Sequence, residues 1–160
     1  MPILATQRAN TGIGKNSMSD RSFLDTKVLV YAHDSGSPEK QKKSREIIAQ
    51  LADTGDGVIS TQVMQEFYVA ATRKLGVDPL VAKGVLKTFA VFEIVQVSTL
   101  LIQEAIDCSI LNQLSFWDSL ILAAAASAGC SVVMSEDLNA RQSILGVKIL
   151  NPFMDQIQVL

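Results

Sequence analysis

Short apolar runs alternate along the chain with longer segments in which apolar residues recur every three or four positions. The runs are expected to be strands, at residues 22–25, 57–60, 91–97, 131–134 and 147–150. The longer segments are expected to be helices, at residues 37–51, 60–75, 79 onward, 99–114 and 115–128. Because the strands are apolar throughout instead of alternating, they are typical of a parallel sheet covered on both faces. The pattern therefore predicts an α/β fold, with a central parallel sheet of about five strands and helices on both faces.

The two ends of the chain differ from its middle. Residues 1–21 are polar, include Gly12 and Gly14, and show no sustained period of either kind, so we expect a mobile N-terminal tail. Residues 22–153 carry the alternating pattern and are expected to form one domain. Residues 154–160 are expected to be a short C-terminal tail.

Composition narrows the class of protein. Of 160 residues, 48% are hydrophobic and 19% are charged, which excludes a disordered or collagen-like chain. The 16 acidic and 14 basic residues give a net charge of −2, so no basic excess points to nucleic acid or to a membrane surface. The longest apolar stretch is too short to cross a membrane, and no apolar signal segment opens the chain. These features favour a cytoplasmic protein.

Few nucleophiles or soft metal ligands are available. Cys108 and Cys130 form no CxxC pair, so we expect core thiols in a reducing compartment, and neither a disulfide nor a zinc site. His33 is the only histidine, so a serine or cysteine triad would have a single candidate base, and we expect this residue to be exposed. A nucleotide-binding glycine loop is absent from the sequence.

Two basic groups and one aromatic residue have both a structural and a functional interpretation. The cluster at residues 40–45 and the pair Arg73 and Lys74 are suited to a phosphate backbone, but a solvated helix face is the commoner explanation of such charges. Trp117, the only tryptophan, is expected to pack beside a helix start instead of stacking on a base.

Four acidic residues stand apart from the solvated charges. Asp25 ends the first apolar run, where parallel sheets place their ligands, although Asp is also a common N-cap. Glu66 shares a helical stripe with Val63, Phe67 and Ala70, which puts a carboxylate on a buried face. It would there need a cation, a network of donors or a metal, and a salt bridge to a nearby Lys or Arg is the simplest of these.

The other two acids have equally simple structural explanations. Asp118 lies three residues after Ser115, which is the spacing of a capping box, and its first-turn position also directs it toward the end of the sheet. Asp137 follows the strand at 131–134, beside Glu136, where it is either a turn residue or a second acid at the carboxyl end of a strand.

Together the four acids suggest more than each does alone. Several carboxylates close together raise each other's pKa unless cations neutralise them. Oxygen ligands without His or Cys favour Mg²⁺ or Mn²⁺ over zinc. An acidic site that holds such ions is suited to phosphodiester hydrolysis, because the metal activates water and stabilises the leaving oxygen.

Five short motifs, taken in order, resemble the PIN-domain family, and most closely its VapC-like toxin branch. They are Phe23-Leu24-Asp25-Thr26, Gln65-Glu66-Phe67, Phe116-Trp117-Asp118-Ser119-Leu120-Ile121, Ser135-Glu136-Asp137-Leu138 and Asn151-Pro152-Phe153. The resemblance spans residues 22–153, and it is the ordered set, not any single motif, that is specific.

The resemblance implies a metal-dependent endoribonuclease, commonly the toxin of a toxin–antitoxin pair. It makes Asp25, Asp118 and Asp137 the principal ligands of Mg²⁺ or Mn²⁺, with Glu66 completing the site directly or through water. Ser135 would be a supporting hydroxyl. The implied partners are an RNA substrate, a cognate antitoxin and a second copy of the chain in a homodimer.

One helix implied by the resemblance conflicts with local propensity. The family begins a helix at residues 26–32, whereas Val28-Leu29-Val30-Tyr31 has the composition of a strand. Both interpretations stay open at this point.

Lys27 departs from the family pattern, which has Asn two residues after the first acid. Asn both donates and accepts hydrogen bonds, whereas Lys only donates and adds a positive charge. If Lys27 points inward, we expect it to pair with Asp25 or Asp118 and to weaken metal binding.

Two other functions compete with the nuclease. A catalytically impaired PIN-like scaffold that binds RNA or a protein partner is favoured by Lys27. A phosphatase of the haloacid-dehalogenase type would need a second acid where Lys27 stands, so it fits the sequence less well.

Overall fold

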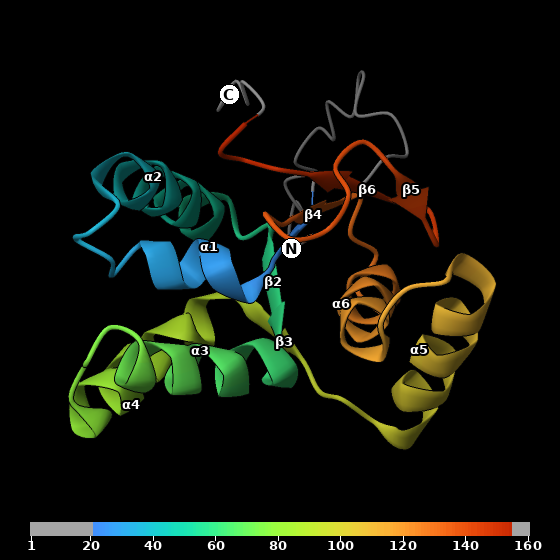
Figure 1. The fold of residues 1–160 in the computed structure, drawn as a ribbon, viewed down its shortest axis with the longest axis horizontal. Helices are drawn as coiled ribbons and strands as arrows, with labels where there is room; N and C mark the ends of the chain where they lie inside the picture. The colour runs from blue at the N-terminus through green and yellow to red at the C-terminus, as the bar shows by residue number, and fades with distance from the viewer. Residues whose placement is uncertain (1–20, 155–160) are drawn as a thin grey trace, which may run out of the picture.

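The computed structural model describes residues 21–154, and residues 1–20 and 155–160 lie outside this range. The tails expected at 1–21 and 154–160 therefore fall almost wholly outside the described residues. The described chain forms one six-stranded sheet in the order β3-β2-β1-β4-β6-β5, with helices packed around it (Figure 1). The predicted α/β fold with a central, mainly parallel sheet is confirmed.

The strands of the sheet are short, and five of them are parallel. Their bounds are β1 Ser22–Leu24, β2 Gly57–Ser60, β3 Glu93–Val95, β4 Val132–Met134, β5 Ser143–Ile144 and β6 Val147–Leu150. The first strand lies in the middle, where Leu24 is in register with Met134 of β4 and Phe23 with Val58 of β2. Only β5 runs antiparallel, against β6. The carboxyl ends of β1, β2 and β4 therefore lie together at one edge of the sheet.

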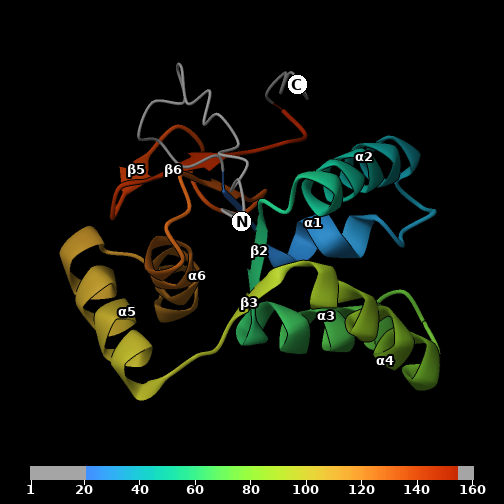
Figure 2. The same ribbon diagram turned by 180° about the vertical axis from the view of Figure 1, so that it is seen from behind.

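Helices lie on both sides of the sheet. They are α1 Thr26–Tyr31, α2 Pro38–Thr54, α3 Thr61–Arg73, α4 Pro79–Thr88, α5 Thr99–Asn112 and α6 Phe116–Ser127, with a 3₁₀ turn η1 at Phe89–Val91. Figures 1 and 2 show α1 and α2 on one side of β2 and α6 on the other, with α5 packed outside α6. Helix α3 packs against α1 and carries α4.

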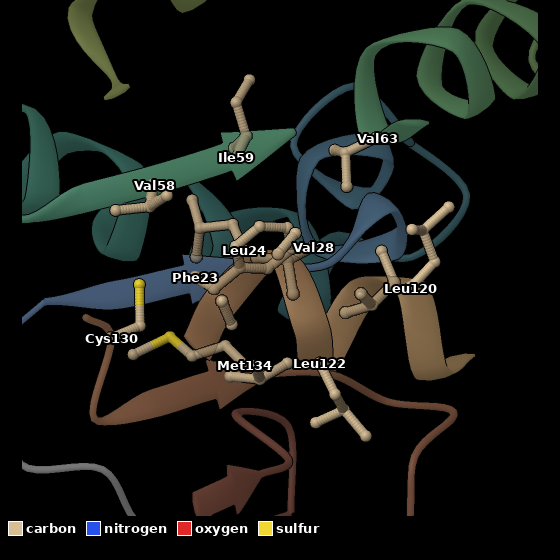
Figure 3. Close-up of a cluster of buried hydrophobic side chains, with 14 of the residues drawn as sticks. Phe23, Leu24, Val28, Val58, Ile59, Val63, Leu120, Leu122, Cys130 and Met134 are labelled. Atoms are coloured by element: carbon tan, nitrogen blue, oxygen red, sulfur yellow. The ribbon is translucent and has the colours of Figure 1, made fainter. Parts of the chain in front are cut away.

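The core forms where the central strands meet these helices. Phe23, Leu24, Val58 and Ile59 are almost fully buried, and Figure 3 shows Phe23 and Leu24 of β1 grouped with Val28 of α1. A strand whose neighbours cover both faces has no polar side to present, which explains the continuous apolar runs in the sequence. Both cysteines are buried and unpaired, as expected.

Residues 26–31 are a helix, so the strand suggested by local propensity is wrong. Asp25 caps this helix by accepting a hydrogen bond from the Thr26 N–H, and Val28 and Leu29 are both fully buried between neighbouring helices. Two adjacent residues of α1 can both be buried because α2 and α3 pack against different sides of this helix. Tertiary packing therefore overrides the β-propensity of the valines.

The remaining differences concern short elements. The strand expected at 91–97 is limited to Glu93–Val95, because Phe89–Val91 forms the 3₁₀ turn. Strand β5 was not expected, and a two-residue turn joins it to β6 with positive φ at both Leu145 and Gly146. Such turns usually carry Asn-Gly or Asp-Gly, so Leu-Gly gave no signal.

Within residues 21–154, every helix is too short or too polar to cross a lipid bilayer.

Candidate functional site

A cleft of about 1080 Å³ opens at the carboxyl ends of the central strands. All four acids singled out from the sequence line it, and each comes from a different part of the chain: Asp25, Glu66, Asp118 and Asp137. The first follows β1, the second lies on α3, the third is in the first turn of α6, and the last follows β4. The parallel topology explains the convergence, because strand ends and the helices that follow them meet at one edge.

Asp25 is partly buried and has a hydrogen bond on each carboxylate oxygen. The Thr26 N–H donates to Oδ1 at 2.7 Å, and the Ser135 hydroxyl donates to Oδ2 at 2.7 Å. Burial raises the pKa of Asp25 from its ordinary 3.8 to about 6; these two hydrogen bonds oppose the shift, and the charges of Glu66 and Asp137 add to it. Asp25 is therefore both the cap of α1 and a wall of the cleft, so the two interpretations of this residue are compatible.

Ser135 joins Asp25 to the loop that follows β4. Its side chain is fully buried, and its oxygen accepts hydrogen bonds from the backbone N–H groups of Asp137 and Leu138, both at 3.2 Å. The hydroxyl thus donates to one acid and fixes the backbone of another. This contact gives a physical basis for the supporting role expected of Ser135.

Glu66 is exposed to the cleft, so its predicted place on a buried face is wrong. Its helical stripe does contain the buried Val63 and Phe67, but the cleft begins at the border of that stripe. The expected Lys or Arg partner is also absent from the interactions of this carboxylate in the described structure. Instead, the Thr26 hydroxyl donates to Oε2 at 2.6 Å and the Gln62 amide donates to Oε1 at 3.0 Å.

Asp118 is placed by the N-terminus of α6. The Ser115 side chain accepts a hydrogen bond from the Asp118 N–H at 3.1 Å, as the expected cap requires. This bond uses the backbone N–H of Asp118 and leaves its carboxylate unused, and Asp118 is one of the residues that line the cleft. The cap and a place at the cleft are therefore compatible for this residue.

Lys27 also lines the cleft. The expected pairing of Lys27 with Asp25 or Asp118 is wrong, because its partner is Asp137. Its Nζ donates to Oδ1 of Asp137 at 2.7 Å. The two side chains are 43% and 51% exposed, and the hydrogen bond to Asp137 raises the pKa of Lys27. The lysine ammonium thus already binds one oxygen of Asp137, which is one of the candidate metal ligands.

The donor set of the cleft fits a hard divalent cation in its chemistry. It consists of carboxylate oxygens, and the raised pKa of Asp25 shows that burial and neighbouring negative charge disfavour ionisation without a compensating cation. Within residues 21–154, however, no three His, Cys, Asp or Glu side chains are gathered closely enough to form a ready metal site. The cleft brings the acids to one place without setting them in a coordination geometry.

Several residues at the site were not found from the sequence. Gln62 lies four residues before Glu66, a spacing that places both on one helix face and was the available signal. Beside the cleft, Glu136 accepts from the Tyr31 hydroxyl at 2.9 Å and from Lys40 at 3.0 Å. No local pattern indicated this network, because its members come from α1, α2 and the loop after β4.

Two expectations on aromatic and imidazole groups have opposite outcomes. His33 is exposed as expected, and its ring meets the ring of Phe67 edge-on, with the ring centroids 5.6 Å apart. Trp117 is 62% exposed and lines the cleft, so the expectation that it is packed away beside the helix start is wrong. Its neighbour Phe116 takes the packed position, since position 116 faces the core.

Comparisons with known proteins agree with this architecture. The sequence model of the PIN domain matches residues 22–142. No curated protein matches the chain in sequence.

Solved structures of VapC-type toxins and their complexes share the fold. VapC20 of Mycobacterium tuberculosis, described as a toxin that cleaves the sarcin-ricin loop, is 18% identical, with a TM-score of 0.61 over 72% of this chain and 91% of that one. A toxin–antitoxin complex from Klebsiella pneumoniae is 15% identical, with a TM-score of 0.61 over 82% and 97%. DNA-bound VapBC from Salmonella typhimurium is 21% identical, with a TM-score of 0.59 over 81% and 96%. The resemblance inferred from the ordered motifs is confirmed, and the chain belongs to the PIN domain family.

Proposed function

We propose that the protein is a metal-dependent endoribonuclease and the toxin of a toxin–antitoxin pair. The observation that carries the proposal is the convergence of four carboxylates, from four separate segments of a PIN domain, on one cleft. VapC20, the neighbour described as a toxin that cleaves the sarcin-ricin loop, shares this fold. Hydrolysis of a phosphodiester needs an activated water and stabilisation of the departing oxygen, and an acidic cleft can hold the ions that supply both.

The proposed ligands of Mg²⁺ or Mn²⁺ are Asp25, Asp118 and Asp137, with Glu66 completing the site. A bound ion would lower the pKa of its water and stabilise negative charge on the leaving oxygen. The chain's own part is to orient these carboxylates. Ser135 directs Asp25 by its hydrogen bond at 2.7 Å, and its oxygen holds the backbone of Asp137.

Thr26 and Gln62 perform the same task for Glu66. Each donates to a different oxygen of the carboxylate, so the Glu66 side chain is held from both sides. Gln62 also donates to the Trp117 carbonyl at 3.3 Å, which ties α3 to the start of α6. Hydrogen bonds of this kind fix ligand orientation, and their loss commonly costs about 10- to 100-fold in metal affinity or activity.

The test is cleavage of an RNA mixture in Mg²⁺, in Mn²⁺ and in EDTA. We expect cleavage with either metal and none in EDTA. The Asp118→Asn variant should reduce cleavage to the level measured in EDTA, whereas the matched variant Asp53→Asn, an exposed acid on α2 outside the cleft, should cleave normally. Cleavage that persists in EDTA or survives Asp118→Asn would refute the proposal.

A second candidate function is a PIN-domain scaffold with little or no cleavage. The Lys27–Asp137 ion pair favours it, because a lysine ammonium already neutralises one proposed ligand. This candidate predicts no metal-dependent cutting by the natural chain together with retained binding of RNA or of a protein partner. The phosphatase alternative has no support in the fold, since the chain is a PIN domain.

The proposal includes three partners: RNA as substrate, an antitoxin and a second copy of the chain. The antitoxin is supported by the neighbours solved as toxin–antitoxin and VapBC complexes. A homodimer is supported by exposed apolar residues on α5, where Leu100, Ile110 and Leu111 are 68%, 71% and 81% exposed. Sedimentation of the purified chain tests the dimer, and co-purification with the product of an adjacent gene tests the antitoxin.

The two unpaired buried thiols agree with action in the cytoplasm.

A further inference from the structure

Trp117 lies at the cleft beside Asp118, and its side chain is 62% exposed. It is the only tryptophan in the chain. Single exposed apolar residues are common, so exposure alone indicates nothing. What distinguishes Trp117 is that it is exposed next to a candidate metal ligand and that its surroundings hold it in place.

Two contacts fix the position of Trp117. Its backbone carbonyl accepts a hydrogen bond from the Gln62 amide, the same group that donates to Glu66. Its ring meets the ring of Phe116 edge-on, with centroids 5.1 Å apart and an interplanar angle of 72°. Phe116 itself packs against the core. The backbone of Trp117 is therefore held to Gln62, and its indole ring is braced on one side by Phe116, which leaves the rest of the ring open to the cleft.

The other end of the same cleft carries positive charge. Arg73 and Lys74 line it at the end of α3, and both are exposed. Among the residues that the structure describes, neither takes part in an ion pair. Arg73 lies seven residues after Glu66 on one helix, a rise of about 10 Å. With a net charge of −2, the protein has no general basic surface, so these cations are a local feature of the cleft.

An exposed aromatic ring, several acids and two exposed cations in one cleft suit a single strand of nucleic acid. Bases stack on aromatic side chains while cations follow the phosphates, and the stacking is sequence-tolerant because every base has a π-face. A base in a duplex is already stacked on both sides, so it is not available to a protein ring.

We propose that Trp117 stacks on an unpaired base of RNA lying in the cleft, while Arg73 and Lys74 contact its phosphates. This inference rests on the proposed function in taking RNA as the ligand, but it does not require that the RNA be cut. Trp117 is then a positioning residue, because it places the strand across the acids and does not touch the reacting phosphate.

The single tryptophan makes the test direct. Its fluorescence is titrated in EDTA with a short single-stranded oligoribonucleotide, with an abasic strand of the same length, and with a duplex RNA. Stacking predicts saturable quenching by the single strand and little change with the abasic strand or the duplex. Free N-acetyltryptophanamide, titrated in parallel, corrects for absorption by the RNA. Absence of quenching by the single strand, or equal quenching by the abasic strand, would overturn the proposal. The exposed ring of Trp117 would then be better explained as a contact for a protein partner.

Variants provide a second, independent measurement by anisotropy of labelled RNA in EDTA. Trp117→Leu, which keeps apolar bulk but cannot stack, should weaken binding about 5- to 100-fold, whereas Trp117→Phe should largely retain it. The double variant Arg73→Gln with Lys74→Gln should weaken binding and reduce its salt dependence, whereas the exposed Lys83→Gln on α4 should change neither. Equal affinity of Trp117→Leu and the natural chain would contradict the inference.

The two proposals can fail separately. Quenching by single-stranded RNA without cleavage in Mg²⁺ or Mn²⁺ would sustain the role of Trp117 and refute the nuclease. Cleavage with an unchanged KM in Trp117→Leu would sustain the nuclease and refute the role of Trp117.

Discussion

The ammonium of Lys27 lies 2.7 Å from a carboxylate oxygen of Asp137, and both residues line the acidic cleft. This ion pair joins α1, which Asp25 caps, to the loop after β4, which carries Asp137. An exposed pair of this kind contributes only about 0–1 kcal/mol to folding. Its importance is therefore in its position, since a metal ion at Asp137 must compete with a cation that the chain itself provides.

Replacing Lys27 should reveal this competition. In Lys27→Asn the competing charge is gone, so the affinity for Mn²⁺, measured by titration calorimetry, should rise about tenfold or more. The variant Lys83→Asn removes the same charge outside the cleft and should leave the affinity unchanged. Equal Mn²⁺ affinities for Lys27→Asn and the natural chain would show that the ion pair does not limit metal binding.

Asp25 should make the stability of the metal-free protein depend on pH. Its pKa is about 6 in the folded state, above the ordinary 3.8, so the unfolded chain releases this proton first as pH rises. Folding is therefore penalised progressively between roughly pH 4 and pH 6 and by up to about 3 kcal/mol above that range. The side chain of the Asp25→Asn variant cannot ionise. The free energy of unfolding of this variant minus that of the parent should therefore increase by up to about 3 kcal/mol as the pH is raised from 4 to 8.

The measurement is urea unfolding in EDTA at several pH values for both proteins. The difference between the two free energies removes the contribution of all other titrating groups. Loss of the hydrogen bond from Ser135 shifts this difference by a constant, whereas ionisation of Asp25 changes it with pH. A difference that stays flat from pH 4 to pH 8 would show that Asp25 titrates normally.

The hydroxyl of Tyr31 should contribute to stability through Glu136. It donates at 2.9 Å to a carboxylate that Lys40 also contacts, and hydrogen bonds to charged groups are stronger than neutral ones. Tyr31→Phe should lower the free energy of unfolding by about 1–2 kcal/mol. The other tyrosine is a matched control, because the Tyr68 hydroxyl makes no hydrogen bond within the described residues, and Tyr68→Phe should change stability by less than about 0.5 kcal/mol.

Two glycines should respond in opposite directions to a methyl group. At Gly57 in β2, a Cβ would lie 2.4 Å from Cδ1 of Phe92, so Gly57→Ala should destabilise by about 1–3 kcal/mol. At Gly84 in α4, the added Cβ meets no atom within 4 Å beyond the adjoining residues and the helix's own backbone, so Gly84→Ala should stabilise the helix by about 0.5–1 kcal/mol. Thermal unfolding of both variants checks this, and a stable Gly57→Ala would mean that the Phe92 ring can move aside.

The sheet and its helices could be predicted because their signals are local. Continuous apolar runs such as Gly57–Ser60 need only their own residues to indicate a buried parallel strand. The helix at Thr26–Tyr31 has no such signal, since its valines favour a strand and only packing by neighbouring helices decides otherwise. Strand β5 depends on a Leu-Gly turn whose composition is unusual for its geometry.

The site was predictable in its members and not in its contacts. Asp25 and Asp137 follow parallel strands, and the topology alone brings such residues to one edge. Whether Lys27 contacts Asp25 or Asp137 depends on the path of the loop after Ser135, which no periodicity encodes. The exposure of the Glu66 side chain likewise depends on which part of the α3 surface borders the cleft, and only the assembled fold determines this.

The central position of β1 has a consequence for the protein as it is being made. Phe23 and Leu24 leave the ribosome 110 residues ahead of their neighbours Val133 and Met134. Until then Asp25 has neither the Ser135 hydroxyl nor the companion acid Asp137, so a growing or prematurely terminated chain cannot assemble the acidic cleft. During translation the acidic cleft can therefore form only after the segment that carries Ser135 and Asp137 has left the ribosome.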